Sequence, residues 1–177
     1  MKKAPLLIAF ALVLCFAVAF LLYRSWRTAV PAAPRGAEAS GGLTAPPFSL
    51  PDVSGNHVAS SRFAGKPTAI NFFATWCPPC REEIPGFVEV YNKYRERGFE
   101  LVGISLDTDT RGDLPQFLMQ NRIGYRILLG DIATARAYGG VTSIPTTFFV
   151  GKDGRIKNVH VGYMDREAFD REVQKLL

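Results

Sequence analysis

The sequence contains few side chains that chelate metals or form disulfides: of its 177 residues, three are cysteine and two are histidine. Cys15 lies inside an apolar run, so only Cys77 and Cys80 remain for a soluble domain. One pair is too few for a disulfide framework, and a four-ligand zinc site needs two further Cys or His nearby. His57 and His160 are far from the pair and from each other in the sequence. We therefore expect no metal site.

A basic surface is also missing from most of the chain. The formal net charge is +5, but residues 1–42 hold five Lys and Arg against one acid, Glu38, which leaves only +1 for residues 43–177. Proteins that bind nucleic acids need a basic face to neutralise phosphates. We therefore expect no nucleic-acid partner, and the length suits one globular domain once a targeting segment is set aside.

An uncharged apolar run covers residues 4–23 (APLLIAFALVLCFAVAFLLY). About 20 such residues suffice for a membrane-spanning helix, and Tyr23 and Trp26 suit the aromatic belt at its interface. A cleaved signal peptide is the alternative, with small residues at positions 17–19 after a shorter apolar core. Because the run continues past that position, we favour an uncleaved membrane anchor over residues 1–28, with Cys15 as a residue of its helix.

Two further segments follow the anchor. Residues 29–43 are rich in Ala, Pro and Gly, a composition that stays flexible or extended and serves as a linker. Residues 44–177 form the folded domain. The positive charges on the two sides of the apolar run are too evenly balanced to orient the anchor.

Within the domain, strand-like and helix-like segments alternate. We expect strands at residues 48–50, 67–73, 99–105, 126–129, 146–150 and 156–161. We expect helices at residues 79–97, 113–121, 131–137 and 165–176. The continuous apolar character of TAINFF and LVGIS predicts central strands covered on both faces. The turn residues at 151–154 predict an antiparallel hairpin between the last two strands, which gives an α/β fold with a mixed central sheet.

The motif WCPPC combines two cysteines at a spacing typical of redox sites. Cys77 stands where a central strand ends and a helix begins, so unpaired N–H groups and the helix dipole favour its thiolate. Cys80, one turn later, can attack a mixed disulfide on Cys77 and release the partner. The pattern predicts that Cys77 is the attacking cysteine and Cys80 the resolving one, with the Cys77–Cys80 disulfide as the redox group and no further cofactor.

The two prolines of the motif limit how acidic Cys77 becomes. If Cys77 is the N-cap, Pro78 and Pro79 occupy the first helical positions and have no N–H to donate, which leaves the Cys80 amide as the close donor. We therefore predict a moderately lowered pKa of Cys77. A highly stabilised thiolate makes a dithiol oxidising, so a moderate one favours a reductant.

Two acids follow the motif. Glu83 stands three residues after Cys80, on the same face of the helix, and can either complement the helix dipole or transfer protons to and from the cysteines. Its charge would also oppose thiolate formation. We interpret Glu82 as a surface residue.

The segment VTSIPTT at residues 141–147 contains a proline just before a strand. Pro145 can be a simple strand-entry residue. If the Ile144–Pro145 bond is cis, the turn leaves backbone groups of Ile144 free to pair with an extended substrate. Ile144 and Pro145 are therefore candidate substrate-binding residues, together with Trp76 and Pro79 of the cysteine motif.

Together, NFFATWCPPCREEIP, SIPTTFFV and GKDGRI resemble the thioredoxin superfamily, in particular the TlpA/ResA-like membrane-anchored thiol-disulfide reductases of bacteria. The resemblance covers residues 44–177. It implies a thioredoxin fold with an N-terminal β-hairpin extension and a central insertion at residues 106–124.

The same resemblance implies roles for single residues. Cys77 becomes the exposed nucleophile, Cys80 the resolving cysteine, Pro145 the cis-proline and Pro85 a kink in the active-site helix. Glu83 falls on the active-site glutamate of these proteins.

One residue departs from the wider superfamily. Cytoplasmic thioredoxins have a buried aspartate in the strand before the motif, and Asn71 stands there in this chain. The resemblance therefore leaves Glu83 as the substitute proton acceptor.

The resemblance also implies a location and partners. It implies a single-pass protein of the bacterial cytoplasmic membrane, with the domain facing the periplasm or outside, where disulfides persist. A membrane thiol transporter is the implied electron donor. The implied substrates are disulfide-containing extracytoplasmic proteins such as apocytochrome c or copper-site proteins.

Two other functions stay open at this point. A peroxiredoxin-like peroxidase would need proline and threonine upstream of its reactive cysteine, where this chain has Ile70 and Ala74. A Sco-like copper-binding chaperone would need a wider cysteine spacing and a histidine near the pair, and VTSIPTT contains none.

Overall fold

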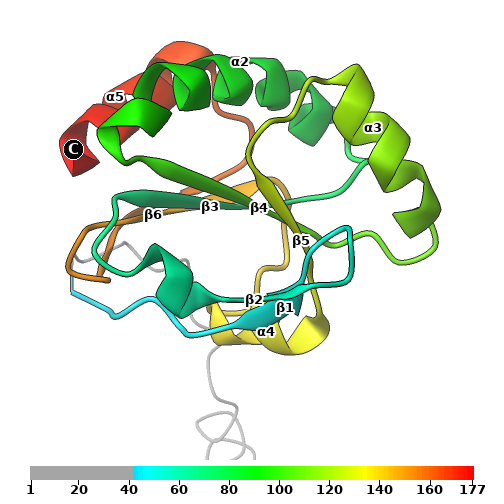
Figure 1. Cartoon of the computed structure of the whole chain (residues 1–177), viewed down its shortest axis with the longest axis horizontal. Helices are drawn as coiled ribbons and strands as arrows, with labels where there is room; N and C mark the ends of the chain where they lie inside the picture. Colours follow the sequence, from blue (N-terminus) through cyan, green and yellow to red (C-terminus); the bar gives the residue numbers. More distant parts are fainter. Residues whose placement is uncertain (1–41) are drawn as a thin grey trace, which may run out of the picture. The chain divides into compact units, whose positions relative to one another are not determined.

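The fold is formed by residues 42–177, which the computed structural model describes (Figure 1). Its strands are β1 (Ser49–Pro51), β2 (His57–Ala59), β3 (Thr68–Phe73), β4 (Glu100–Ser105), β5 (Arg126–Leu129), β6 (Thr146–Val150) and β7 (Ile156–Val161). Its α-helices are α2 (Pro78–Tyr94), α3 (Leu114–Gln120), α4 (Ile132–Ala137) and α5 (Arg166–Leu176). Short 3-10 helices are η1 (Ser60–Phe63), η2 (Arg95–Arg97) and η3 (Arg111–Asp113).

A five-stranded sheet of order β5-β4-β3-β6-β7 forms the centre of the domain. β3 pairs in parallel with β4, and β4 with β5, whereas β6 pairs antiparallel with both β3 and β7. All six residues of β3 are buried, as expected for a central strand covered on both faces. Ile70, in the middle of β3, lies opposite Val102 on one side and Phe148 on the other.

Each face of the sheet has its own hydrophobic cluster. Helices α2, α3 and α5 cover one face, and the β1–β2 hairpin with α4 covers the other (Figure 1). On the helical face, the rings of Phe87 and Phe169 stack with their centroids 3.8 Å apart. On the hairpin face, Tyr138 packs edge-on against Phe148, with centroids 5.0 Å apart. The sheet is thereby held between two separate apolar layers.

The expected α/β alternation is confirmed, and most elements begin and end within two residues of their predicted bounds. The antiparallel β6–β7 hairpin is also as predicted. The strand β2 was not among the predicted segments. It has only three residues, too few to show a periodic pattern, and it forms through its antiparallel pairing with β1. The two form the N-terminal hairpin that the resemblance implied.

The predicted anchor at residues 1–28 and nearly all of the linker at 29–43 lie outside the described residues, as does Cys15. Within residues 42–177, no helix has the length and apolar character needed to cross a bilayer.

The stacked pair Phe87 and Phe169 joins α5 to α2, and Phe169 is fully buried. Replacing Phe169 with Ala should lower the free energy of unfolding by about 3–5 kcal/mol, because a large cavity opens between the helices. Urea unfolding of the oxidised protein measures this change. Met119→Ala, at an exposed position of α3, is the control, and should stay within about 0.5 kcal/mol of the wild type. A loss below about 1 kcal/mol for Phe169→Ala would show that this stack does not support the helical layer.

Candidate functional site

The two cysteines lie where β3 runs into α2. Residues 74–77 connect the two elements, and the Cys77 amide donates to the Ala74 carbonyl at 3.2 Å. Cys77 is the N-cap of α2, with extended backbone angles of φ −85° and ψ 112°. Its sulfur accepts a hydrogen bond from the Cys80 amide at 3.3 Å. The prediction that Cys77 caps the helix and uses the Cys80 amide is confirmed.

Cys77 and Cys80 form a disulfide, with their Cα atoms 5.3 Å apart. Cys77 is only 3% exposed and Cys80 is 0% exposed. The expectation of an exposed Cys77 is therefore wrong for this oxidised form. The cause is its position between the start of α2 and residue Ile144, whose carbonyl oxygen lies 3.8 Å from the Cys77 sulfur.

The prolines of the motif take the predicted places. Pro78 and Pro79 fill the first two helical positions, where a missing N–H costs the helix nothing. Pro78 is exposed and Pro79 is half-buried. Pro85 lies inside α2, which continues past it to Tyr94.

Of the candidate substrate-binding residues, Trp76 and Pro79 lie next to the cysteines in the chain, and Ile144 approaches Cys77 through its carbonyl. The Ile144–Pro145 bond is cis, and the Pro145 carbonyl accepts from the Gly162 amide at 2.8 Å. Pro145 is buried and Ile144 is half-buried. Trp76 is 60% exposed, so its large side chain is accessible at the surface.

Glu83 lies in the protein interior, only 2% exposed. One of its oxygens accepts from the Asn71 side-chain amide at 2.9 Å, and the other accepts from the Met164 amide at 3.2 Å. Burial raises the pKa of Glu83 to about 8, although these two hydrogen bonds act in the opposite direction. At neutral pH Glu83 therefore holds its proton. Glu82 is exposed, as predicted.

Asn71 links Glu83 to the strand next to the cis-proline. Its amide nitrogen also donates to the Thr147 hydroxyl at 3.0 Å. Its amide oxygen is buried and has no hydrogen-bond partner among the described residues. Asn71 therefore acts as a donor to Glu83 and not as a second titrating acid.

A second buried carboxylate, which the sequence pattern did not reveal, contacts Thr75, two residues before Cys77. Asp107, 1% exposed, follows the end of β4. It accepts from the Thr75 amide at 3.1 and 3.2 Å, from the Thr75 hydroxyl at 2.6 Å, from the Ser105 hydroxyl at 2.7 Å and from the Thr110 hydroxyl. Burial by itself would raise the pKa of Asp107, but these hydrogen bonds outweigh it and lower the pKa. The only signal in the sequence is an acid just after a buried strand.

A groove of about 360 Å³ lies beside Trp76. It is bounded by Arg81 of α2 and by Gln116, Phe117 and Gln120 of α3. The Arg81 guanidinium lies 5.6 Å from the centre of the Phe117 ring and donates to the Thr75 carbonyl at 3.3 Å. A larger cavity of about 630 Å³, next to Lys157 and Glu172, contains no residue of the cysteine site.

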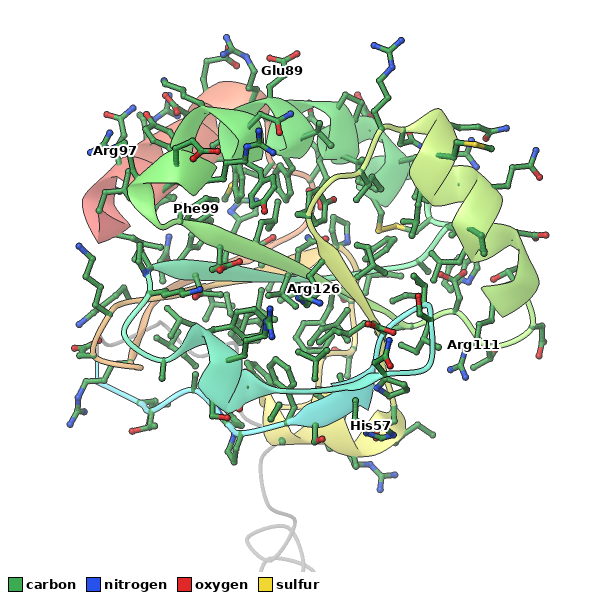
Figure 2. The ribbon with its side chains drawn as sticks, in the orientation of Figure 1. His57, Glu89, Arg97, Phe99, Arg111 and Arg126 are labelled. Carbon is green, nitrogen blue, oxygen red and sulfur yellow. A yellow bond between two sulfur atoms is a disulfide. The ribbon has the colours of Figure 1, made fainter. Side chains whose placement is uncertain are left out.

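Residues 42–177 contain no group of three or more His, Cys, Asp and Glu placed to hold a metal ion. Figure 2 shows His57 at the hairpin that covers the face of the sheet opposite α2. His160 is on β7, and its Nε2 lies 3.0 Å from the Tyr163 carbonyl oxygen. Neither histidine forms a hydrogen bond with Cys77 or Cys80 in residues 42–177.

Known proteins are similar to this chain in sequence and in fold. Residues 42–159 match the AhpC/TSA family. The chain is 31% identical to the thiol-disulfide oxidoreductase ResA of Bacillus thuringiensis subsp. konkukian (strain 97-27), over 99% of both chains. It is 28% identical to ResA of Geobacillus kaustophilus (strain HTA426), also over 99% of both.

Among solved structures, a thiol:disulfide interchange protein of the thioredoxin family from Chlorobium tepidum TLS matches with a TM-score of 0.71 and 36% identity. The match covers 79% of this chain and 99% of that one. The thioredoxin fold that the motifs implied is confirmed. The chain belongs to the AhpC/TSA family and is a TlpA/ResA-like thiol-disulfide oxidoreductase of the thioredoxin superfamily.

Proposed function

We propose that the protein is a membrane-anchored reductase of disulfides in extracytoplasmic proteins. The observation that carries the direction of electron flow is the N-cap at Cys77, whose sulfur accepts from one backbone amide, that of Cys80. The prolines at the first two helical positions have no N–H to add. A thiolate with one such donor is stabilised moderately, and the dithiol then gives up its electrons more readily.

The reaction passes two electrons from the dithiol to the substrate. The Cys77 thiolate attacks one sulfur of a substrate disulfide, a mixed disulfide forms, and the other substrate sulfur leaves as a thiolate that takes up a proton. Cys80 then loses its proton and attacks the Cys77 sulfur. The Cys77–Cys80 disulfide forms and the second substrate thiol is released. A donor dithiol reverses these steps and restores the reduced enzyme.

Glu83 is the group that we propose for moving the proton of Cys80. It lies on the same helix three residues after Cys80, and with a pKa of about 8 it is protonated at neutral pH in the oxidised form. When a donor opens the disulfide, Cys80 leaves as a thiolate and Glu83 can supply its proton. In the forward direction, Glu83 takes the proton back.

We propose that the substrate lies as an extended segment along Ile144 and Pro145. The Ile144 carbonyl is 3.8 Å from the Cys77 sulfur, so a strand paired with this residue would bring its own cystine against Cys77. Exposed Trp76 and half-buried Pro79 would cover the apolar side chains next to that cystine.

The proposed location and partners rest on the sequence. Residues 4–23 would cross the cytoplasmic membrane, the domain would face the periplasm or outside, and a membrane thiol transporter would supply electrons. Apocytochrome c and copper-site proteins are the substrate classes that we propose. The names of the relatives, thiol-disulfide oxidoreductase and thiol:disulfide interchange protein, support the reaction and specify no substrate.

The roles of the cysteines are tested with Cys80→Ala. Without a resolving thiol, the mixed disulfide on Cys77 persists, so membranes that contain this variant should yield disulfide-linked partners on a non-reducing gel, identified by mass spectrometry. Cys77→Ala is the matched control and should trap none of them. Capture of the same partners by Cys77→Ala would reverse the assigned roles, and capture by neither would contradict the proposed reaction.

The direction of electron flow is tested by the reactivity of Cys77. In the reduced protein, the pH midpoint for alkylation of Cys77 by iodoacetamide should lie below that of a free thiol, about 8.5, and above about 5. Mass spectrometry of the Cys77 peptide follows the reaction separately from Cys80 and Cys15. A midpoint below about 5 belongs to strongly oxidising dithiols and would contradict a reductase.

The raised pKa of Glu83 predicts a dependence of stability on pH. The folded protein holds this proton up to about pH 8, whereas the unfolded chain loses it near 4.5. The stabilisation is therefore complete below pH 4.5 and is lost as the pH rises to about 8, at about 1.4 kcal/mol per pH unit. Glu83→Gln should remove this contribution, as measured by urea unfolding of the oxidised protein between pH 5 and 8.

Glu82→Gln is the matched control, because Glu82 is the exposed neighbour on the same helix. It should retain the slope of the wild type. If Glu83 moves the proton of Cys80, Glu83→Gln should also slow disulfide reduction by about tenfold or more, and Glu82→Gln should not. Equal slopes for the two variants would contradict the raised pKa, and equal rates would contradict the catalytic role.

The two alternative functions find no specific support at the site. Ile70 and Ala74, which stand where a peroxiredoxin-like peroxidase needs proline and threonine, are buried apolar residues before the motif. For a Sco-like chaperone, the segment that contacts Cys77 contains Ile144 and no histidine. The reductase remains the function that the geometry supports best.

A further inference from the structure

Asp107 carries a negative charge in the interior, and all the hydrogen bonds that the structure gives this carboxylate come from neutral groups. They are the amide and hydroxyl of Thr75 and the hydroxyls of Ser105 and Thr110. Burying a charge is costly unless such donors surround it. Ser105 and Thr110 are within three residues of Asp107, whereas Thr75 is 32 residues away, so the carboxylate joins the loop that follows β4 to a distant segment that contains Thr75.

The distant segment is the connection between β3 and α2. Thr75 lies two residues before Cys77, in a stretch with no regular secondary structure of its own. Asp107 accepts from the amide and the hydroxyl of Thr75, and Arg81 donates to the Thr75 carbonyl at 3.3 Å. Hydrogen bonds thus hold both the amide and the carbonyl of Thr75. The next two residues in the chain are Trp76 and Cys77.

The loop of Asp107 itself leads into the insertion that contains α3. Thr110 precedes η3, which leads into α3, and α3 forms one wall of the groove beside Trp76. Because Thr75 and Thr110 share one carboxylate, the two walls of that groove have a common anchor.

We propose that Asp107 is a positioning residue for the dithiol, which through Thr75 and Thr110 sets where Cys77 and Trp76 lie relative to Ile144 and α3. This inference rests on the proposed reductase function. Asp107 acts through Thr75 and does not itself touch the cysteines in any contact that the structure gives. We expect it to control the alignment of the Cys77 sulfur with the Cys80 amide and with Ile144.

The test compares Thr75→Val, which deletes one hydroxyl at nearly constant shape, with Thr75→Ser, which keeps it. In Thr75→Val the N-cap contact at Cys77 should weaken, and the pH midpoint of Cys77 alkylation should rise by about half a unit to one unit. Reduction of insulin disulfides, with dithiothreitol as donor, should slow by about tenfold, since small misplacements of reacting atoms have large kinetic effects. Thr75→Ser should restore both values.

Asp107→Asn provides a second variant with the same shape and no charge. Its amide nitrogen would face the Thr75 N–H, the Ser105 hydroxyl or both, where the carboxylate accepts. We expect shifts of the same sign as in Thr75→Val, or larger. Arg81, Glu82 and Glu83, the ionisable residues of α2 that directly follow the dithiol, are unchanged in both variants.

Asp131→Ala is the control for stability alone. It removes the side chain that caps α4, on the opposite face of the sheet, where it accepts from the Thr134 amide at 2.7 Å. This variant should unfold at a lower temperature and keep the wild-type alkylation midpoint and rate. If Thr75→Val and Asp107→Asn behave in the same way, Asp107 is only structural and the proposal is wrong.

The measurements distinguish a failure of the proposed reductase function from a failure of the positioning role of Asp107. A wild-type protein that reduces no insulin disulfide would count against the proposed function, whereas the alkylation midpoint reads the position of Cys77 without any substrate. An alkylation midpoint that rises in Thr75→Val and equals the wild-type value in Thr75→Ser supports the positioning role even if the protein reduces no insulin disulfide. An unchanged midpoint in both Thr75→Val and Asp107→Asn overturns it.

Discussion

The hydrogen bond from the Cys80 amide to the Cys77 sulfur is the contact on which the rest of the site depends. It exists because β3, buried along its whole length, ends at a fixed point and α2 begins five residues later. The prolines at positions 78 and 79 start the helix and remove the competing donors. In the proposed mechanism, the same two residues that define where the helix begins also limit how strongly the thiolate is stabilised.

Two buried carboxylates near the motif reach opposite protonation states for one physical reason. Glu83 accepts one side-chain and one backbone hydrogen bond, which do not compensate for its burial, so its pKa rises to about 8. Asp107 accepts from an amide and three hydroxyls, which do compensate, so its pKa is lowered. The number of donors decides between the two outcomes. Glu83 is therefore the carboxyl group suited to the proposed proton exchange, whereas Asp107 stays charged.

The sequence predicted those parts of the fold and site that depend on short-range patterns. The apolar strands, the N-cap at Cys77 and the turn at 151–154 each depend on residues only a few positions apart. The hydrogen bonds of Asp107 to Thr75 and of Glu83 to Met164 join residues 32 and 81 positions apart. No local pattern encodes such contacts. The burial of Cys77 was missed for the same reason, because Ile144, which lies against it, is 67 positions away.

Asn71 shows how the central strand simplifies the proton chemistry. An aspartate at this position would place a second carboxyl group against Glu83, and two such groups titrate as a coupled pair. The amide instead donates to Glu83 at 2.9 Å and to Thr147 at 3.0 Å, which fixes the glutamate against the strand that follows the cis-proline. Its oxygen, buried and without a partner in the described part of the chain, indicates that the donor function of this side chain is what matters here. Asn71 therefore adds no second titrating group next to Glu83, and the β3–β6 pairing that sets Asn71 opposite Thr147 holds this donor in place.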